Sequence, residues 1–296
     1  GARHVLKTKL PLFDYQRIGA EFIMNNKFCL LGDQPGLGKS LTALVACEEL
    51  KLEKVLVITM ASLKENFKEE VKKWFPDSKA LVIESGFGQA KRILQYKEKA
   101  KYYILNYETM VRDLEILKQT EWEMILADEC TKIHNPQTKM AKAIKQLNGL
   151  RRCGMTGTII SNTPANLWSP MTWLLPGLLG NWYQFRQAYC ITDYWGNVTS
   201  YQNMEHLQKR IAPYILRREK KDVMKELPEK TYVDITVELS TGERKIYNAI
   251  KSEVLHYLED QDLSKIDLGT INSILTKMVR LLQVADSTEL VGENTK

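Results

Sequence analysis

The sequence predicts an α/β protein built on a parallel β-sheet with helices on both faces. Three observations lead to this prediction. Short apolar runs alternate along the chain with segments of helical periodicity. The apolar runs are hydrophobic at consecutive positions, as is typical of strands that are buried on both faces of a parallel sheet. Two polar motifs directly follow such runs, and open α/β sheets bind their ligands at the carboxyl ends of the strands.

The predicted elements alternate in order as far as residue 156. Strands are predicted at residues 28–31, 55–59, 80–83, 102–105, 124–127 and 153–156. Helices are predicted between them at residues 41–50, 63–74, 89–96 and 139–147. Strands alternating with helical segments of this length indicate parallel pairing through crossover helices.

The chain changes character near residue 166. Residues 166–218 are rich in aromatic side chains and turn signals, and we expect a helical elaboration of the first domain there. A β-like alternation at 232–239 and a long helical pattern follow. We therefore expect one α/β domain over residues 1–240 and a helical bridge over residues 241–296. Four tryptophans are expected in the core because of their helical spacing, with stacking on bases as the alternative: Trp168, Trp173, Trp182 and Trp195.

A phosphate-binding loop is predicted between the first strand and the first of these helices. Its glycines allow a tight turn that brings backbone N–H groups onto phosphate oxygens, next to a helix amino terminus. Lys39 supplies a charge for the β- and γ-phosphates, and Ser40 a hydroxyl ligand for Mg²⁺. The strict pattern has glycine where this chain has Asp33. An ordinary turn with a surface lysine is the alternative. The residues expected at the nucleotide are Asp33, Gly36, Leu37, Gly38, Lys39, Ser40 and Leu41.

Asp128 and Glu129 form a second motif at the end of the predicted strand 124–127. Adjacent carboxylates beside a buried strand need a partner, because desolvated charge is costly. A Mg²⁺–nucleotide is such a partner: Asp128 is expected to hold the metal, and Glu129 to orient and deprotonate the attacking water. A solvated acidic turn is the alternative. With Lys39, these two carboxylates are the predicted catalytic residues.

Composition excludes several classes of protein. The chain has 296 residues, of which 44% are apolar, enough for a large core or two domains. The net charge of +6 permits a nucleic-acid partner but does not establish one. The five cysteines include no Cys-x-x-Cys pair and are expected to be reduced and buried. No apolar run approaches the roughly 20 residues of a membrane span. We expect no signal peptide, no membrane partner and a cytoplasmic or nuclear location.

Taken in order, the motifs resemble those of the Swi/Snf-type DNA translocases of helicase superfamily two. The resemblance covers nearly the whole chain. It rests on residues 13–16 with Gly19 (the adenine-binding segment), 33–40 (motif I, in which Asp33 is a family trait), 57–63 (motif Ia), 106–109 (motif Ib), 128–136 (motif II), 155–158 (motif III) and 216–230 (the exit from the first lobe).

The resemblance implies a first RecA-like lobe that binds ATP and Mg²⁺, with Gln16 at the adenine. It also implies contacts to the backbone of double-stranded DNA. Hydroxyl, amide and backbone N–H groups can hold phosphates without reading bases. We expect such contacts from Thr59, Ser62, Thr158 and Asn162.

Two features of the chain leave questions open within this resemblance. Cys130-Thr131 stand where the family usually has Ala-His, and Thr131 keeps a hydroxyl that is expected to point toward Thr156. The second is a basic run, which either touches DNA or packs the lobe and pairs with neighbouring acids. The run consists of Arg217, Arg218, Lys220 and Lys221.

The family has two lobes, and the chain resembles the first. The second RecA-like lobe, the expected partner, supplies an arginine finger that is worth about 10³–10⁵ in rate in related enzymes. We therefore expect the monomeric ATP-binding lobe of a DNA-dependent ATPase that translocates on duplex DNA, with poor turnover in this chain alone. The alternatives are a strand-separating helicase of the same superfamily and a nucleotide-gated DNA-binding module with little hydrolysis.

Overall fold

The computed structural model of the chain describes residues 4–158, 163–223, 240–259, 276 and 279. The chain forms two compact units, residues 1–227 and 228–296. The β-strands of the described residues all lie in the first unit. In the second unit, the described helix is α12 (Thr241–Glu259), within the region predicted as a helical bridge.

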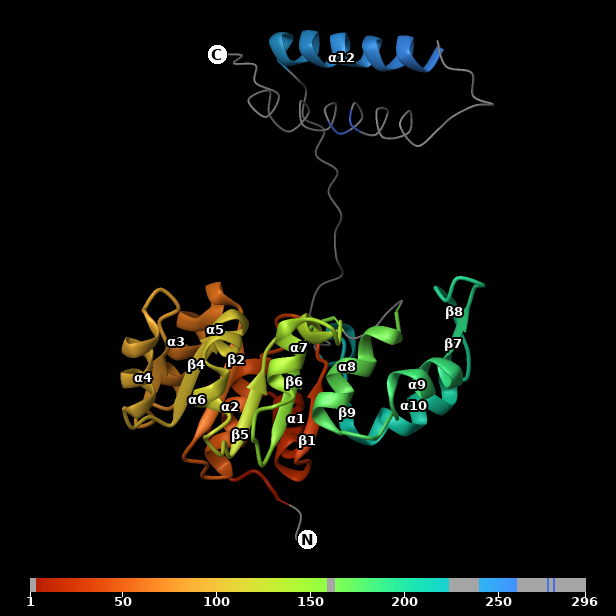
Figure 1. Ribbon diagram of the computed structural model, residues 1–296. Helices are drawn as coiled ribbons and strands as arrows, with labels where there is room; N and C mark the ends of the chain where they lie inside the picture. Colours follow the sequence, from red (N-terminus) through yellow and green to blue (C-terminus); the bar gives the residue numbers. More distant parts are fainter. Residues whose placement is uncertain (1–3, 159–162, 224–239, 260–275, 277–278, 280–296) are drawn as a thin grey trace. The chain divides into compact units, whose positions relative to one another are not determined.

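A parallel sheet of seven strands forms the centre of the first unit, with the order β3-β4-β2-β5-β6-β1-β9 (Figure 1). Each pairing in this sheet is parallel. The predicted parallel α/β fold is therefore confirmed. The strands are β1 (Phe28–Leu31), β2 (Val55–Thr59), β3 (Ala80–Val82), β4 (Tyr102–Asn106), β5 (Met124–Ala127), β6 (Arg152–Met155) and β9 (Ile215–Leu216).

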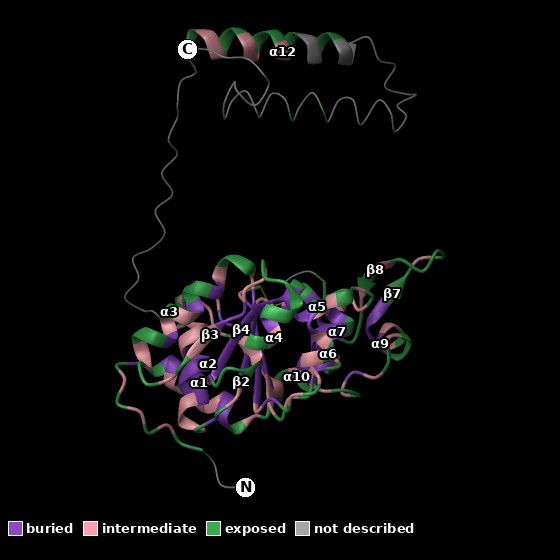
Figure 2. Cartoon of the chain, turned by 60° about the vertical axis from the view of Figure 1, so that its left-hand side comes forward, coloured by how far each residue is buried: buried purple, intermediate pink, exposed green. Residues whose placement is uncertain are grey.

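Helices cover both faces of the sheet, and successive residues of one strand show this directly. Val55 and Val57 belong to a core shared with α1 (Asp14–Asn25), α2 (Lys39–Glu49) and α3 (Lys64–Trp74). Leu56 and Ile58 belong to a second core on the other face. The central strands β1, β2, β4, β5 and β6 are accordingly almost wholly buried (Figure 2). The edge strands β3 and β9 are mostly half-buried. The second core includes residues of α5 (Tyr107–Arg112), α7 (Lys139–Ile144), α8 (Ala165–Leu174) and α9 (Trp182–Tyr189).

Further helical segments complete the first unit. They are η1 (Ala61–Leu63), α4 (Gln89–Lys97), α6 (Leu114–Leu117), η2 (Cys130–Ile133), α10 (Met204–Ile211), η3 (Ala212–Tyr214) and α11 (Lys220–Val223). Helix α9 begins where it does because Asn181 and Gln184 form a reciprocal capping box, which satisfies two backbone N–H groups at its start.

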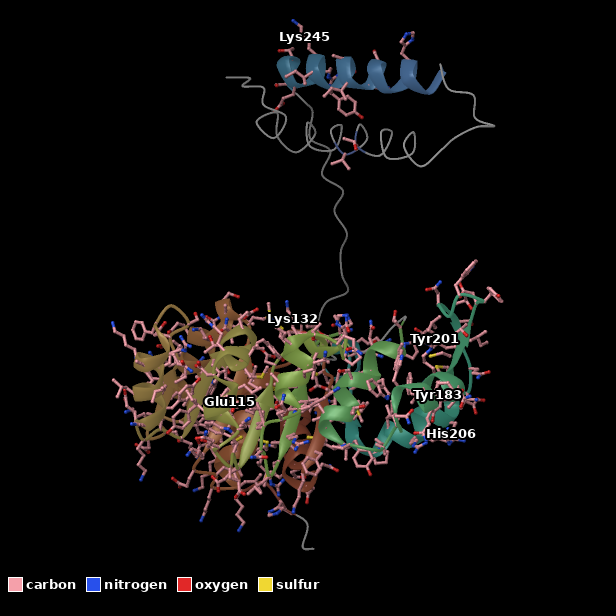
Figure 3. The ribbon with its side chains drawn as sticks, in the orientation of Figure 1. Glu115, Lys132, Tyr183, Tyr201, His206 and Lys245 are labelled. Carbon is pink, nitrogen blue, oxygen red and sulfur yellow. The ribbon has the colours of Figure 1, made fainter. Side chains whose placement is uncertain are left out.

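The region after residue 165 is not wholly helical, contrary to the prediction. It contains an antiparallel hairpin of β7 (Cys190–Thr192) and β8 (Val198–Tyr201). Asp193 closes the turn by accepting hydrogen bonds from the backbone and side chain of Asn197. In Figure 3 the labelled side chains of Tyr183, Tyr201 and His206 lie on this part of the unit. The β-branched residues around a Gly-containing turn were the signal for this hairpin.

The expectation for the tryptophans is correct for Trp168 and Trp173, which are buried, and Trp182 packs partly buried against the same core. It is wrong for Trp195, which is 82% exposed. Trp195 lies in the turn of the β7–β8 hairpin, so helical spacing did not apply to it. The predicted strand at 232–239 lies outside the described residues.

Candidate nucleotide-binding and catalytic site

The carboxyl ends of three neighbouring strands bring the predicted motifs together at one edge of the sheet. The phosphate loop follows β1, and the Asp128–Glu129 pair follows β5. Strand β6 lies between these two strands and ends at Met155, which is followed by Thr156. Chain segments far apart in sequence therefore meet here because of strand order.

The phosphate loop has the strained turn that its glycines predict. Gly36 and Gly38 have φ angles of +86° and +76°, a region that favours glycine. The ammonium of Lys39 donates to the carbonyl oxygen of Asp33 at 2.9 Å. Burial lowers the pKa of Lys39, and the charges of Glu129, Asp128 and Asp33 oppose this by raising it. Lys39 therefore lies within electrostatic reach of both catalytic candidates.

Asp128 is held by its neighbours from three directions. The Thr59 hydroxyl donates to Asp128 Oδ2 at 2.9 Å, and the Tyr107 hydroxyl donates to the Asp128 carbonyl at 2.8 Å. Its backbone N–H donates to the carbonyl of Ile58, at the end of β2. Burial raises the pKa of Asp128, and the hydrogen bond from Thr59 opposes this. A buried carboxylate of this kind gains from a nearby cation.

Glu129 has a left-handed backbone with φ of +46°, one of three positive-φ non-glycine residues among those described. Such a conformation costs of the order of 1 kcal/mol and is common at functional sites. The Thr156 hydroxyl donates to Glu129 Oε2 at 3.2 Å. The predicted contact of Thr131 with Thr156 does not occur among the hydrogen bonds of the described residues. Thr156 orients Glu129 instead.

The Thr156–Thr158 turn also contacts the phosphate loop. A Cβ atom on Gly157 would lie 2.7 Å from Pro35 Cγ and 3.5 Å from Lys39 Nζ, so only glycine allows this approach. The backbone N–H of Thr158 donates to Thr156 Oγ1 at 3.1 Å. Motifs I, II and III are thus in direct contact through Lys39, Gly157 and the Glu129–Thr156 hydrogen bond.

Gln16 joins helix α1 to the phosphate loop. Its side-chain oxygen accepts from the Phe13 N–H at 3.1 Å, which caps the helix, and its Nε2 donates to the Leu37 carbonyl at 3.4 Å. Phe13 is 60% exposed and stacks on Tyr15. The role of Gln16 at the adenine stays a prediction.

The Asp33 side chain has a partner within the protein, and its contact with the nucleotide stays a prediction. Its carboxylate is fully buried and receives two hydrogen bonds from the guanidinium of Arg218, one of them at 2.9 Å. This carboxylate therefore stabilises the loop from its buried side. Leu37 is also buried, so only its backbone can face a ligand. The pairing of Arg218 with Asp33 was not predicted, although an aspartate in place of a loop glycine indicates a buried charge in need of a cation.

The predicted DNA contacts fall into three groups. Thr59 is fully buried and bonded to Asp128, so its side chain positions the carboxylate and has no surface for a phosphate. Ser62 and Thr158 are exposed beside this edge of the sheet. Asn162 lies outside the described residues. Lys132 projects from the same edge (Figure 3).

The described residues also show features that concern metals, membranes and cysteines. No group of three or more His, Cys, Asp or Glu side chains there is arranged for a metal ion. No described helix has the length and apolar character needed to cross a membrane. All five cysteines are buried and free, as the sequence predicts.

Comparison with known proteins identifies the family. The model of the SNF2-related domain family matches residues 15–290. The chain belongs to this family.

Solved structures of SNF2-related proteins agree with this. The SWI2/SNF2 ATPase core of Sulfolobus solfataricus in complex with dsDNA is 29% identical, with a TM-score of 0.66, over 100% of this chain and 62% of that one. A second structure, of the SWI2/SNF2 ATPase core domain of Sulfolobus solfataricus, is 28% identical, with a TM-score of 0.63, over 99% of this chain and 60% of that one.

Curated proteins are similar to this chain over most of its length. An uncharacterised ATP-dependent helicase of Mycoplasma genitalium is 30% identical over 88% of this chain and 25% of its own length. The chromatin-remodelling ATPase INO80 of Arabidopsis thaliana is 28% identical over 97% of this chain and 20% of its own length. The chain thus spans a quarter or less of the length of these relatives.

Proposed function

We propose that this chain is the ATP-binding lobe of a DNA-dependent ATPase that translocates on duplex DNA. The observation that carries the proposal is the meeting of Lys39, Asp128 and Glu129 at one edge of the sheet, linked through Thr156 and Gly157. A phosphate loop alone binds many nucleotides. A water-activating carboxylate beside it favours hydrolysis.

The geometry supports a role for each of these residues. The backbone N–H groups of residues 36–40 and the ammonium of Lys39 bind the β- and γ-phosphates. Glu129 takes the proton of the attacking water, and the Thr156 hydroxyl holds Glu129 Oε2 in place. Thr59 does the same for Asp128.

Mg²⁺ fits the residues that are present. The Asp128 carboxylate is buried beside a second carboxylate, and a divalent cation would offset the cost of that charge. Ser40, in the first turn of α2, is the second protein ligand. Few protein ligands suffice, because Mg²⁺ retains water and phosphate oxygens in nucleotide sites. The ion would neutralise phosphate charge during transfer.

Duplex DNA is the proposed partner, and the dsDNA complex of the Sulfolobus relative supports this choice. Ser62 and Thr158 are exposed at the carboxyl edge, where hydroxyl and backbone groups can hold phosphates. Binding by one lobe should be weak, indifferent to base sequence and lost as salt rises. Titration of two unrelated duplexes at two salt concentrations tests this; a strong preference for one sequence at high salt would contradict it.

The turnover of this chain alone is proposed to be low. A site on one lobe leaves the γ-phosphate open to water, and a second RecA-like lobe would supply the arginine finger. DNA-stimulated phosphate release should be compared between this chain and a protein extended by a second lobe. Equal rates would overturn this part of the proposal.

Nucleotide binding is tested with a pair of lysine variants. In calorimetric titrations with Mg-ATP, Lys39→Ala should lower affinity by more than about tenfold, since a charge-assisted contact is lost. Lys27→Ala is the matched control, because Lys27 is exposed and precedes β1 at its opposite end. Equal affinities of Lys39→Ala and the parent, with equal melting temperatures, would contradict the proposal.

A further inference from the structure

The segment that follows η3 runs along the phosphate loop and is hydrogen-bonded to it at three points. We call residues 215–220 the exit segment. Its first two residues form β9, which pairs with β1. Beyond the strand, the Gly32 N–H donates to the Leu216 carbonyl at 2.7 Å, and the Gln34 N–H donates to the Arg218 carbonyl at 3.0 Å. The Lys220 N–H donates to the Gln34 side-chain oxygen at 2.9 Å.

A buried ion pair fixes the middle of the exit segment. The Arg218 side chain is 11% exposed and pairs with Asp33, which is fully buried. The same guanidinium also donates to the Tyr15 carbonyl and lies 5.5 Å from the centre of the Tyr15 ring. A planar guanidinium bound at two oxygens has a single orientation, so the residues that follow it in the chain are placed accurately.

As a result, the Lys220 side chain lies beside Gly36 of the phosphate loop. Its Nζ is 3.0 Å, and its Cε 3.3 Å, from the position that a Cβ on Gly36 would occupy. Gly36 is thus the loop residue that leaves room for this side chain. The ammonium stands beside the backbone that is proposed to bind phosphate.

The partners of the neighbouring basic residues differ from those of Lys220. Arg217 and Lys221 both pair with Glu219, at 3.4 Å and 2.9 Å. Within the part of the chain that the structure describes, no carboxylate forms an ion pair with Lys220. A cation held beside an anion-binding loop without an acidic partner is arranged to meet an anion.

On the basis of the proposed nucleotide site, we propose that Lys220 is a second phosphate-binding cation of that site, held over the loop by the Arg218–Asp33 pair. It adds to Lys39 a positive charge that comes from the exit segment and not from the loop itself. Bound polyphosphate then contacts the segment through which the chain leaves the sheet, so nucleotide binding and the position of that segment are linked.

The test compares nucleotides with and without phosphates in titrations of the 296-residue chain. Lys220→Ala should lower affinity for ATP and ADP by about tenfold, the usual value of one charge-assisted contact, and leave affinity for adenosine unchanged. Lys220→Arg should keep most of the ATP affinity. Lys221→Ala is the matched control: it removes the same charge one residue away, from a side chain that is 76% exposed.

Two outcomes would overturn the inference. One is ATP affinity of Lys220→Ala within about twofold of the parent, at an unchanged melting temperature. The other is an equal loss in Lys220→Ala and Lys221→Ala, because that would reflect net charge and not a contact. Failure of the proposed function would give a different result. In that case the parent chain itself would bind no ATP and would not differ from Lys39→Ala.

Discussion

Two buried arginine–aspartate pairs in the first unit have the same chemistry and different positions. Arg92 donates to both oxygens of Asp113, at 2.7 and 2.6 Å, and Arg218 donates to both oxygens of Asp33. Both aspartates are fully buried. Each pair has a tyrosine beside it: the Tyr96 hydroxyl donates to Asp113 at 3.0 Å, and the Tyr15 ring lies against Arg218.

The two pairs differ in what they join. Arg92 and Asp113 are 21 residues apart and fasten α4 to the junction of α5 and α6, away from the phosphate loop. Arg218 and Asp33 are 185 residues apart and fasten the exit segment to that loop. An ion pair of this kind therefore does not mark a functional site by itself. Its meaning depends on the segments that it holds together.

The largest expected effect is on stability, and it should be similar for both pairs. Arg92→Ala and Arg218→Ala each leave a buried aspartate without its cation, which typically costs about 3–5 kcal/mol. Urea unfolding of the two variants and the parent measures the change in the free energy of unfolding. A loss below about 1 kcal/mol in either variant would show that the pair is more solvated than its burial indicates.

Conservative variants should separate the two pairs by function. Arg92→Lys and Arg218→Lys keep the charge but lose the two-point contact, so both chains should fold with reduced stability. We expect ATP affinity to fall about threefold or more in Arg218→Lys, where Lys220 and the loop shift, and to stay unchanged in Arg92→Lys. Calorimetry at a temperature where both are folded tests this. Equal ATP affinities would mean that the two pairs are both purely structural.

Sequence reasoning predicted the sheet well because a parallel sheet buried on both faces needs unbroken apolar runs. The six predicted strands agree with the observed ones within one residue at each end. Strand β9 was missed because two residues, Ile215 and Leu216, carry no pattern. Helices α1, α5 and α6 were also missed, although Gln16 and Tyr107 lie in motifs that were recognised.

The site was predictable where its residues are neighbours in sequence. The phosphate loop and the Asp128–Glu129 pair each depend on a local pattern at a strand end. The contacts that support them cross the sheet: Thr59 reaches Asp128 from β2, and Arg218 reaches Asp33 across 185 positions. Such partners depend on strand order and side-chain direction, which one sequence does not specify.

The tyrosines beside the two pairs should have smaller effects on stability, and the larger of these should occur at the Arg92–Asp113 pair. In the ATP-affinity test, the larger effect is expected at the Arg218–Asp33 pair. Tyr96→Phe removes a hydrogen bond to a buried carboxylate and should cost about 1–2 kcal/mol. Tyr15→Phe keeps the ring and the backbone carbonyl that face Arg218, so its cost should stay within about 0.5 kcal/mol. Urea unfolding compares them. A larger loss in Tyr15→Phe would show that its hydroxyl, and not its ring, supports the loop.

The smallest expected effect concerns Glu70, a carboxylate that forms no ion pair with an arginine among the described residues. Glu70 Oε2 is buried without a hydrogen-bond partner among the described atoms. Burial raises the pKa of Glu70 above its ordinary value of 4.5, and Lys73 opposes this. A carboxyl whose pKa rises on folding destabilises the fold once it is ionised. The contribution of Glu70 to the free energy of unfolding therefore decreases as the pH rises from 4.5 to the raised pKa of this carboxyl.

Glu70→Gln should accordingly stabilise the chain at neutral pH by about 0.5 kcal/mol or less. The gain should disappear below pH 4.5, where Glu70 is neutral in both the folded and the unfolded chain. Thermal melts of variant and parent across this range, with the exposed Glu69→Gln as control, measure it. Asp33 and Asp113 should respond in the opposite sense, since replacing either by Asn leaves a buried arginine without its charge partner and destabilises the chain. If Glu70→Gln were destabilising at neutral pH, Glu70 would have a cation partner like the two aspartates, and the contrast between paired and unpaired carboxylates would fail.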